Sequence, residues 1–172
     1  MPYRKALIVI DMQNDYLWDK RKKMFTYDTE KLTDEVNSAI ARYREDGAFI
    51  IYVAQVFPDI PTNRLIIGFS IKDTEGAKFW KGLNVVSDLY FEKNFPDSFT
   101  AKEFKAHMKE MQYSEITVCG LDLCGCVGRT ALGAVKVCDN VSLIESATGT
   151  RYKEKKIASM KQKLTKAGVK II

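Results

Sequence analysis

Apolar residues along the chain alternate between short continuous runs and longer stretches with helical spacing. Residues 6–10 read Ala-Leu-Ile-Val-Ile, a run typical of a strand buried on both faces of a parallel sheet. Over residues 28–46 the apolar positions recur at three- and four-residue steps. This spacing predicts an amphipathic helix that is capped by Asp28 and ends at Gly47. Residues 48–56 are rich in β-branched and aromatic side chains and predict a second strand.

The alternation of strand and helix continues to the end of the chain. Further strands are expected at residues 88–93, 115–120, 140–146 and 169–172. Helices are expected after a capping-box sequence at residues 100–103, at residues 125–137, and in the lysine-rich segment after residue 151. Residues 58–82 are irregular and predict a long functional loop containing a short helix.

The order of these elements predicts the fold. Because crossovers between parallel strands are right-handed, alternating strands and helices indicate a three-layer α/β/α architecture. We expect a Rossmann-like, six-stranded, mostly parallel sheet that forms a single domain over residues 1–172. A length of 172 residues with 46% hydrophobic and 28% charged residues suits one ordinary globular domain.

Charge and hydropathy exclude several classes of partner. The excess of positive charge falls in residues 151–172, where eight Lys and Arg residues face one acid, Glu154. Only Tyr152 accompanies them as an aromatic residue, so this segment predicts the solvated face of an amphipathic helix and no nucleic-acid partner. The apolar run near the N-terminus is too short for an export signal or a membrane span. We therefore expect no membrane partner and a cytoplasmic protein with reduced thiols.

The chain contains one histidine, His107. A single histidine excludes a metal site built on several histidines, and we expect neither a metal nor a cofactor. It also leaves a Ser–His or Cys–His catalytic device only one candidate base. His107 lies in a predicted helix among charged residues, which is typical of a surface position.

Three chemically useful side chains follow strands of the predicted sheet. Asp11 comes directly after the first strand, Lys93 ends the third, and the loop after the fourth leads to Cys126 at a helix start. Ligands of such sheets bind outside the carboxyl ends of the strands. A helix N-terminus favours a thiolate and can lower the pKa of a cysteine to about 3.5–7.5. The alternatives are a turn aspartate, a solvated lysine and a buried apolar cysteine.

Without a suitable histidine, Asp11 is the candidate base for a nucleophilic thiol, and Lys93 is placed to keep it ionised. Position alone leaves two nucleophiles open, because Cys124 and Cys126 flank Gly125 in the same loop. Cys119 and Cys138 lie in an apolar strand and at a helix end and are expected to be packing residues.

Residues 8–16 (IVIDMQNDY), 91–99 (FEKNFPDSF) and 120–131 (GLDLCGCVGRTA) together resemble the motifs of the isochorismatase-like cysteine hydrolases. The three motifs occur in that family's order, and the resemblance spans essentially the whole chain. It implies a catalytic triad of Cys126, Asp11 and Lys93. It also implies a cis peptide before Asp122, with the backbone N–H groups of Asp122 and Cys126 as oxyanion donors. The Val-x-x-Thr-Ala sequence that follows Cys126 aligns this thiol, and not that of Cys124, with the family's nucleophile.

The resemblance also implies a function. Members of the family typically hydrolyse small amides, and many are homo-oligomers. We therefore expect a hydrolase that cleaves the C–N bond of a small, non-peptide amide through a thioester, without a cofactor, in a homo-oligomer (dimer or higher). The expected pocket wall consists of loop aromatic residues at the same sheet edge: Tyr16, Trp18, Phe57, Trp80 and Phe95.

The chain departs from the family pattern at three points. The segment 55–63, where nicotinamidases of the family bind a metal, has no histidine. Leu123-Cys124 replaces a frequent Thr-Asp pair, and Gly133 replaces a frequent acidic residue.

One alternative function is enol-ether hydrolysis of the isochorismatase type, which would leave the thiol without a role. Another is a non-catalytic oligomeric binding module; the intact triad argues against it, and the altered loop keeps it open. Redox chemistry between Cys124 and Cys126 would require a strained disulfide.

Overall fold

A six-stranded parallel sheet forms the centre of the protein in the computed structural model, which describes residues 3–172. The strands are β1 (Lys5–Ile10), β2 (Phe49–Gln55), β3 (Tyr90–Lys93), β4 (Glu115–Leu121), β5 (Val141–Gly149) and β6 (Lys170–Ile171). Their order across the sheet is β3-β2-β1-β4-β5-β6, and every neighbouring pair is parallel. The expected three-layer fold is confirmed, and the sheet is entirely parallel.

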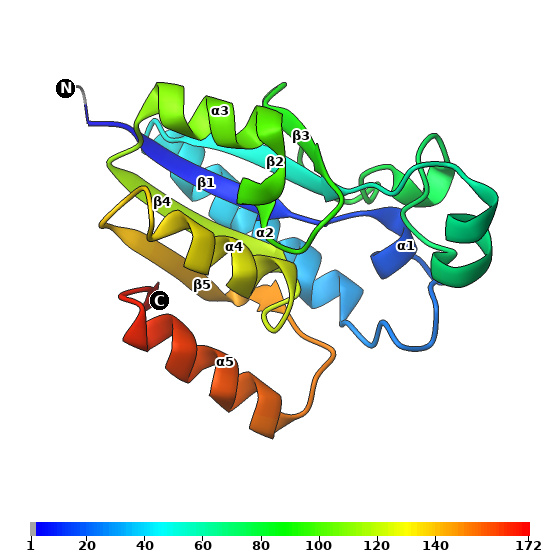
Figure 1. The fold of residues 1–172 in the computed structure, drawn as a ribbon. Helices are drawn as coiled ribbons and strands as arrows, with labels where there is room; N and C mark the ends of the chain where they lie inside the picture. The colour runs from blue at the N-terminus through cyan, green and yellow to red at the C-terminus, as the bar shows by residue number, and fades with distance from the viewer. Residues whose placement is uncertain (1–2) are drawn as a thin grey trace.

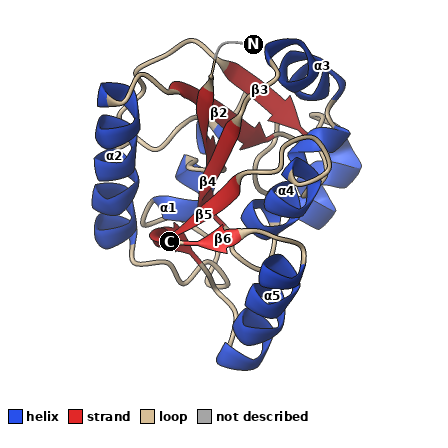
Figure 2. Cartoon of the chain, turned by 90° about the vertical axis from the view of Figure 1, so that its left-hand side faces the viewer, coloured by secondary structure: helices blue, strands red, loops and turns tan. Residues whose placement is uncertain are grey.

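Helices cover both faces of this sheet (Figures 1 and 2). The α-helices are α1 (Asn14–Leu17), α2 (Thr29–Glu45), α3 (Lys102–Met111), α4 (Cys126–Ala134) and α5 (Glu154–Lys166). Helix α2 lies on one face, whereas α3, α4 and α5 lie on the other (Figure 2). No helix within residues 3–172 is long and apolar enough to cross a membrane. The strand order reverses between β1 and β4, and in such sheets this reversal marks the binding crevice.

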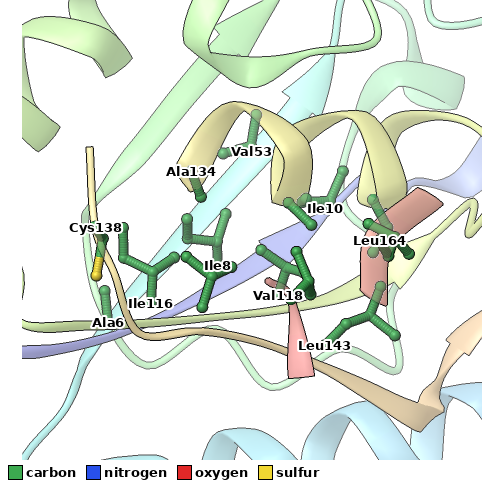
Figure 3. Packing of buried hydrophobic residues seen from close by; sticks show 14 of the residues in the cluster. Ala6, Ile8, Ile10, Val53, Ile116, Val118, Ala134, Cys138, Leu143 and Leu164 are labelled. Atoms are coloured by element: carbon green, nitrogen blue, oxygen red, sulfur yellow. The ribbon is translucent and has the colours of Figure 1, made fainter. Parts of the chain in front are cut away.

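The continuous apolar run of β1 supplies both halves of the core. Ile8 and Ile10 point into the cluster under α3, α4 and α5, together with Val118 and Leu164 (Figure 3). Leu7 and other alternate residues of β1 point into the second cluster, under α2. Successive side chains of a strand point to opposite faces, so a strand between two helical layers must be apolar at every position.

Most predicted elements are found within a few residues of their expected bounds. The helix cap at Asp28 is confirmed, because its carboxylate accepts a hydrogen bond from the Lys31 N–H at 3.1 Å. The predicted capping box is wrong. Helix α3 begins after Ala101 without a side-chain cap, and the Thr100 hydroxyl bonds the carbonyl of Asp97 instead. Thr100 belongs to the 3₁₀ turn η3 (Ser98–Thr100), which precedes the helix.

The region between β2 and β3 is mostly irregular, as expected. It contains a π-helical turn, η1 (Asn63–Ile67), and a 3₁₀ turn, η2 (Glu75–Ala77). The short helix α1 packs beside η2. The Asn14 side chain donates a hydrogen bond to the Glu75 carbonyl at 2.8 Å. This contact ties the start of the chain to the long loop beside the sheet edge.

Candidate active site

Asp11 and Lys93 form a buried ion pair at the carboxyl edge of the sheet. Asp11 follows β1 with a φ of 54°, and its N–H donates to the Val53 carbonyl at 2.8 Å. Lys93 is the last residue of β3, and its Nζ lies 3.0 Å from Asp11 Oδ2. The side chains are 0% and 4% exposed for Lys93 and Asp11 respectively. Burial alone would lower the pKa of Lys93, but the charges of Asp11 and Cys126 outweigh it and raise that pKa.

Cys126 is the first residue of α4 and shares a cavity with Asp11. Burial and the negative charge of Asp11 raise the pKa of its thiol, whereas the charge of Lys93 opposes them. The expectation of a lowered pKa at this helix start is therefore wrong, because burial and Asp11 raise the pKa of the thiol. The resting thiol is protonated, and a thiolate must be produced by transfer of its proton to a base.

One carboxylate oxygen at the site has no partner. Asp11 Oδ2 is bound to Lys93, but Asp11 Oδ1 is buried and makes no hydrogen bond with any residue of 3–172. Buried polar atoms are rarely left unsatisfied, and exceptions mark functional positions. Asp11 Oδ1 is thus a free, oriented acceptor beside the thiol.

The loop after β4 is held by its own carboxylate. The Leu121–Asp122 peptide is cis. Asp122 Oδ1 accepts from the Cys124 N–H at 2.8 Å, and Oδ2 accepts from the Arg151 N–H at 2.8 Å and the Tyr27 hydroxyl at 3.0 Å. Leu123 and Cys124 do not remove the hydrogen bonding of this loop, because Asp122 itself organises it.

Two backbone N–H groups of this loop remain without partners. Leu123, Gly125 and Val127 each donate to a backbone carbonyl. Within residues 3–172, no such hydrogen bond is found for the N–H groups of Asp122 and Cys126. These are the two donors that the family resemblance implies for an oxyanion.

A cavity of about 250 Å³ opens beside the thiol. Its polar wall includes Asp11, Gln55, Cys126 and Arg151. Its aromatic wall consists of Tyr16, Phe25, Tyr27, Phe57, Phe69 and Tyr152. A cavity of this size suits a small molecule, and its few polar groups converge near one nucleophile.

The structure brings together only two of the five expected wall residues. Tyr16 and Phe57 line the cavity. Trp18 lines a separate cavity beside η2, and Trp80 packs against the hydrophobic cluster under α2. Phe95 is 64% exposed and does not line the cavity.

Several wall residues were missed by the sequence interpretation. Arg151 and Tyr152 follow β5, so the strand-end rule that located Asp11 could have found them. Phe25 and Phe69 lie in irregular segments far apart in sequence, and no local pattern brings them together. Their rings pack edge to face with centroids 5.2 Å apart.

Arg151 presents a cation to the cavity. Its guanidinium lies 5.4 Å from the Phe25 ring centre and 4.9 Å from that of Tyr152, and Nη2 donates to the Tyr152 hydroxyl at 3.0 Å. No ion pair of Arg151 is found within residues 3–172. The aromatic rings hold the guanidinium in place while part of its hydrogen-bonding capacity remains free.

The described residues offer no donor set for a resident metal. Within residues 3–172, no three His, Cys, Asp or Glu side chains lie close enough together to hold a metal ion. The segment 55–63, where nicotinamidases of the family resemblance hold a metal, contains one carboxylate, Asp59, which pairs with Arg64. The residues present in this segment therefore do not fit a metal site.

Comparison with protein families identifies the chain. Residues 5–172 match the model of the Isochorismatase domain. The chain belongs to the isochorismatase family. Members of this family are hydrolases, and the match extends over all six strands and the loop that carries Cys126. No match is found among curated protein sequences.

Solved structures share the fold over nearly the whole chain. Pyrazinamidase of Pyrococcus horikoshii in complex with zinc is 22% identical with a TM-score of 0.84, covering 98% of both chains. N-carbamoylsarcosine amidase of Thermoplasma acidophilum is 21% identical with a TM-score of 0.79, covering 98% of this chain and 95% of the other. Nicotinamidase of Bacillus subtilis is 22% identical with a TM-score of 0.79, covering 98% of both. At these identities the likeness establishes the fold.

Proposed function

We propose that this protein hydrolyses the C–N bond of a small, non-peptide amide through a thioester on Cys126. The observation that carries the proposal is the buried Asp11–Lys93 pair, which shares its site with Cys126 and whose Asp11 Oδ1 has no hydrogen-bond partner among residues 3–172. The family is one of hydrolases, and similar structures include three amidases. Enol-ether hydrolysis would leave this arrangement around the thiol without a role.

In the first half of the reaction, Asp11 takes the proton of Cys126 and the thiolate attacks the amide carbon. The carbonyl π electrons move to oxygen, and the N–H groups of Asp122 and Cys126 donate to the resulting oxyanion. Asp11 then gives its proton to the amide nitrogen as the C–N bond breaks. Ammonia or an amine leaves, and a thioester remains on Cys126.

In the second half, Asp11 takes a proton from water and hydroxide attacks the thioester carbon. The same two N–H groups stabilise the second oxyanion. The C–S bond breaks as this intermediate collapses, the acid is released, and the thiolate recovers its proton from Asp11. The Lys93 ammonium lies 3.0 Å from Asp11 Oδ2 and balances the negative charge of this carboxylate between proton transfers.

The cavity also limits the substrate. Flat aromatic walls favour a planar amide or carbamoyl group close to Cys126. Arg151, for which no ion pair is found within residues 3–172, supplies a cation with planar, forked donors, which suit a carboxylate. We infer that the preferred substrates carry an acidic group on the side of the amide that faces Arg151.

The test is a panel of small carboxamides and N-carbamoyl compounds, each with and without a carboxylate, assayed for ammonia release. Mass spectrometry under acid quench is expected to detect an acyl adduct on Cys126. Cys126→Ala is expected to reduce turnover by at least about 10³-fold and to leave the fold unchanged, with Cys138→Ala as the matched control. Full turnover by Cys126→Ala, or an adduct on Cys124, would contradict the proposal.

A further inference from the structure

Gln55 is a buried side chain at the centre of the site that the proposed reaction does not use. It is the last residue of β2, the strand between β1 and β3, and is 5% exposed. Its Oε1 accepts a hydrogen bond from Lys93 Nζ at 2.9 Å and a long one from the Cys126 thiol, with Sγ 3.9 Å away. One carboxamide oxygen therefore contacts both the ammonium and the nucleophile.

A second glutamine fixes the main chain of Gln55. Gln13 is 0% exposed, and its Nε2 donates to the Gln55 carbonyl at 2.9 Å. The Gln55 N–H in turn donates to Gln13 Oε1 at 3.0 Å. These two bonds resemble the main-chain pairing between neighbouring strands and fix the end of β2. They therefore fix the point at the sheet edge from which the Gln55 side chain extends.

The hydrogen-bond partners also fix which way the carboxamide of Gln55 points. Its Nε2 donates to the main-chain carbonyl of Lys93 at 3.1 Å. A carbonyl can only accept and an ammonium can only donate. Turning the carboxamide over would bring donor against donor and acceptor against acceptor, so Oε1 must face the ammonium.

The position of Lys93 follows from these contacts. An ammonium has three N–H bonds, of which one goes to Asp11 Oδ2 and one to Gln55 Oε1. With these two bonds fixed, the third N–H bond of Lys93 and its positive charge are held near Cys126. A carboxylate in place of this neutral carboxamide would compete with Asp11 for the thiol proton.

We propose that Gln55 is a positioning residue, which holds the Lys93 ammonium between Asp11 and Cys126 and leaves Asp11 as the only base for the thiol. This inference rests on the proposed function for its catalytic consequence. The positioning role also has an effect on the resting protein that needs no substrate. The Lys93 ammonium favours the thiolate of Cys126, so its position affects how readily this thiol reacts.

The decisive measurement is the rate at which iodoacetamide alkylates Cys126 at fixed pH, read by mass spectrometry, because it needs no substrate. Gln55→Met keeps the side-chain length and removes both bonds to Lys93, together with the long acceptor contact for the Cys126 thiol. We expect alkylation to slow about threefold or more between pH 8 and pH 9.5, because weaker stabilisation of the thiolate by a less well held ammonium outweighs the loss of this 3.9 Å contact. With a substrate from the panel, kcat is expected to fall about tenfold to a hundredfold, with KM changed less than about threefold.

Two further variants guard against a merely structural effect. Gln55→Asn keeps the carboxamide but is too short for both bonds, and the same slowing is expected if Gln55→Met does not fold. Thr117→Val removes the buried hydrogen bond from the Tyr43 hydroxyl, 3.0 Å long, under the other face of the sheet. It is expected to lower the melting temperature and leave the alkylation rate unchanged.

The outcomes separate this inference from the proposed function. Alkylation within twofold of the unmodified protein, or faster, in the Gln55 variant that folds would overturn the positioning role even if amides are hydrolysed. Slowed alkylation in a protein that hydrolyses no amide would retain the positioning role and overturn the proposed function. An equal slowing by Thr117→Val would show a general loosening of the fold and contradict the inference.

Discussion

The floor and the wall of the cavity are built in different ways. We call the part of the polar lining formed by Asp11 and Cys126, together with Lys93 buried behind it, the floor; these residues lie at strand or helix ends and are fixed by the parallel sheet. The wall consists of aromatic residues from irregular segments, such as Phe25 and Phe69, together with the Arg151–Tyr152 pair. The proposed chemistry therefore depends on regular structure, whereas the proposed choice of substrate depends on loops that a rigid scaffold carries.

The strongest test of this difference between floor and wall is Asp11→Asn, a change in the floor. It should lower the turnover rate and raise the rate at which Cys126 is alkylated. Removal of the base is expected to reduce kcat by about 10²–10⁴-fold. Removal of its negative charge takes away one cause of the raised pKa of Cys126, so the thiol should be alkylated faster at any given pH. The checks are turnover of the best panel substrate and iodoacetamide labelling between pH 6 and pH 10.

The direction of the change in alkylation rate follows from the raised pKa of the Cys126 thiol. Because burial and Asp11 raise the pKa of the thiol, the unmodified protein should be alkylated about tenfold faster for each added pH unit, without a plateau near neutrality. Asp11→Asn should move this curve to lower pH. Slower alkylation together with slower turnover would mean that Asp11 supports the fold of the site without acting as its base.

The same division explains what the sequence could predict. A carboxylate, a lysine and a thiol at the ends of strands can be recognised because all parallel strands end at one edge of the sheet. The wall could not be assembled in this way, since Phe69 reaches the cavity through the fold of a loop with no periodic pattern. Phe95 was misplaced for the complementary reason, because a motif fixes its place in the chain and leaves the direction of its side chain open.

The thiol shows a different limit. A position at a helix start predicts a stabilised thiolate, and the structure places Cys126 at such a start. The extent of desolvation depends on every residue that covers the site, and no stretch of sequence near Cys126 reports it. Local rules thus pointed to a candidate nucleophile and gave the wrong direction for the pKa of its thiol.

A smaller effect is expected from Arg151→Gln, a change in the wall. Loss of a charged donor should raise KM for carboxylate-bearing amides about tenfold to a hundredfold. Neutral amides of the same size should be affected less than about threefold, and kcat should stay nearly constant, because Arg151 does not touch the floor. Michaelis–Menten kinetics on matched pairs of substrates provide the check.

Arg151→Lys is the matched control, since it keeps the charge and loses the planar fork and the stacking on Phe25 and Tyr152. It should recover only part of the lost affinity. An equal rise in KM for neutral and acidic amides would show that Arg151 shapes the cavity without reading charge, and the inferred acidic substrate would then be wrong.

The smallest effect is expected from Phe95→Ala, which tests where the wall ends. Phe95 is 64% exposed and lies outside the cavity, although it follows Lys93 by only two residues. Its loss should change kcat/KM less than about twofold, as is usual for an exposed side chain. Phe57→Ala is the comparison within the wall and should raise KM about threefold to tenfold through lost aromatic contact. An effect of Phe95→Ala as large as that of Phe57→Ala would mean that Phe95 covers the cavity when substrate binds. The wall would then extend to the loop after β3 and would be positioned by the same strand that positions Lys93 in the floor.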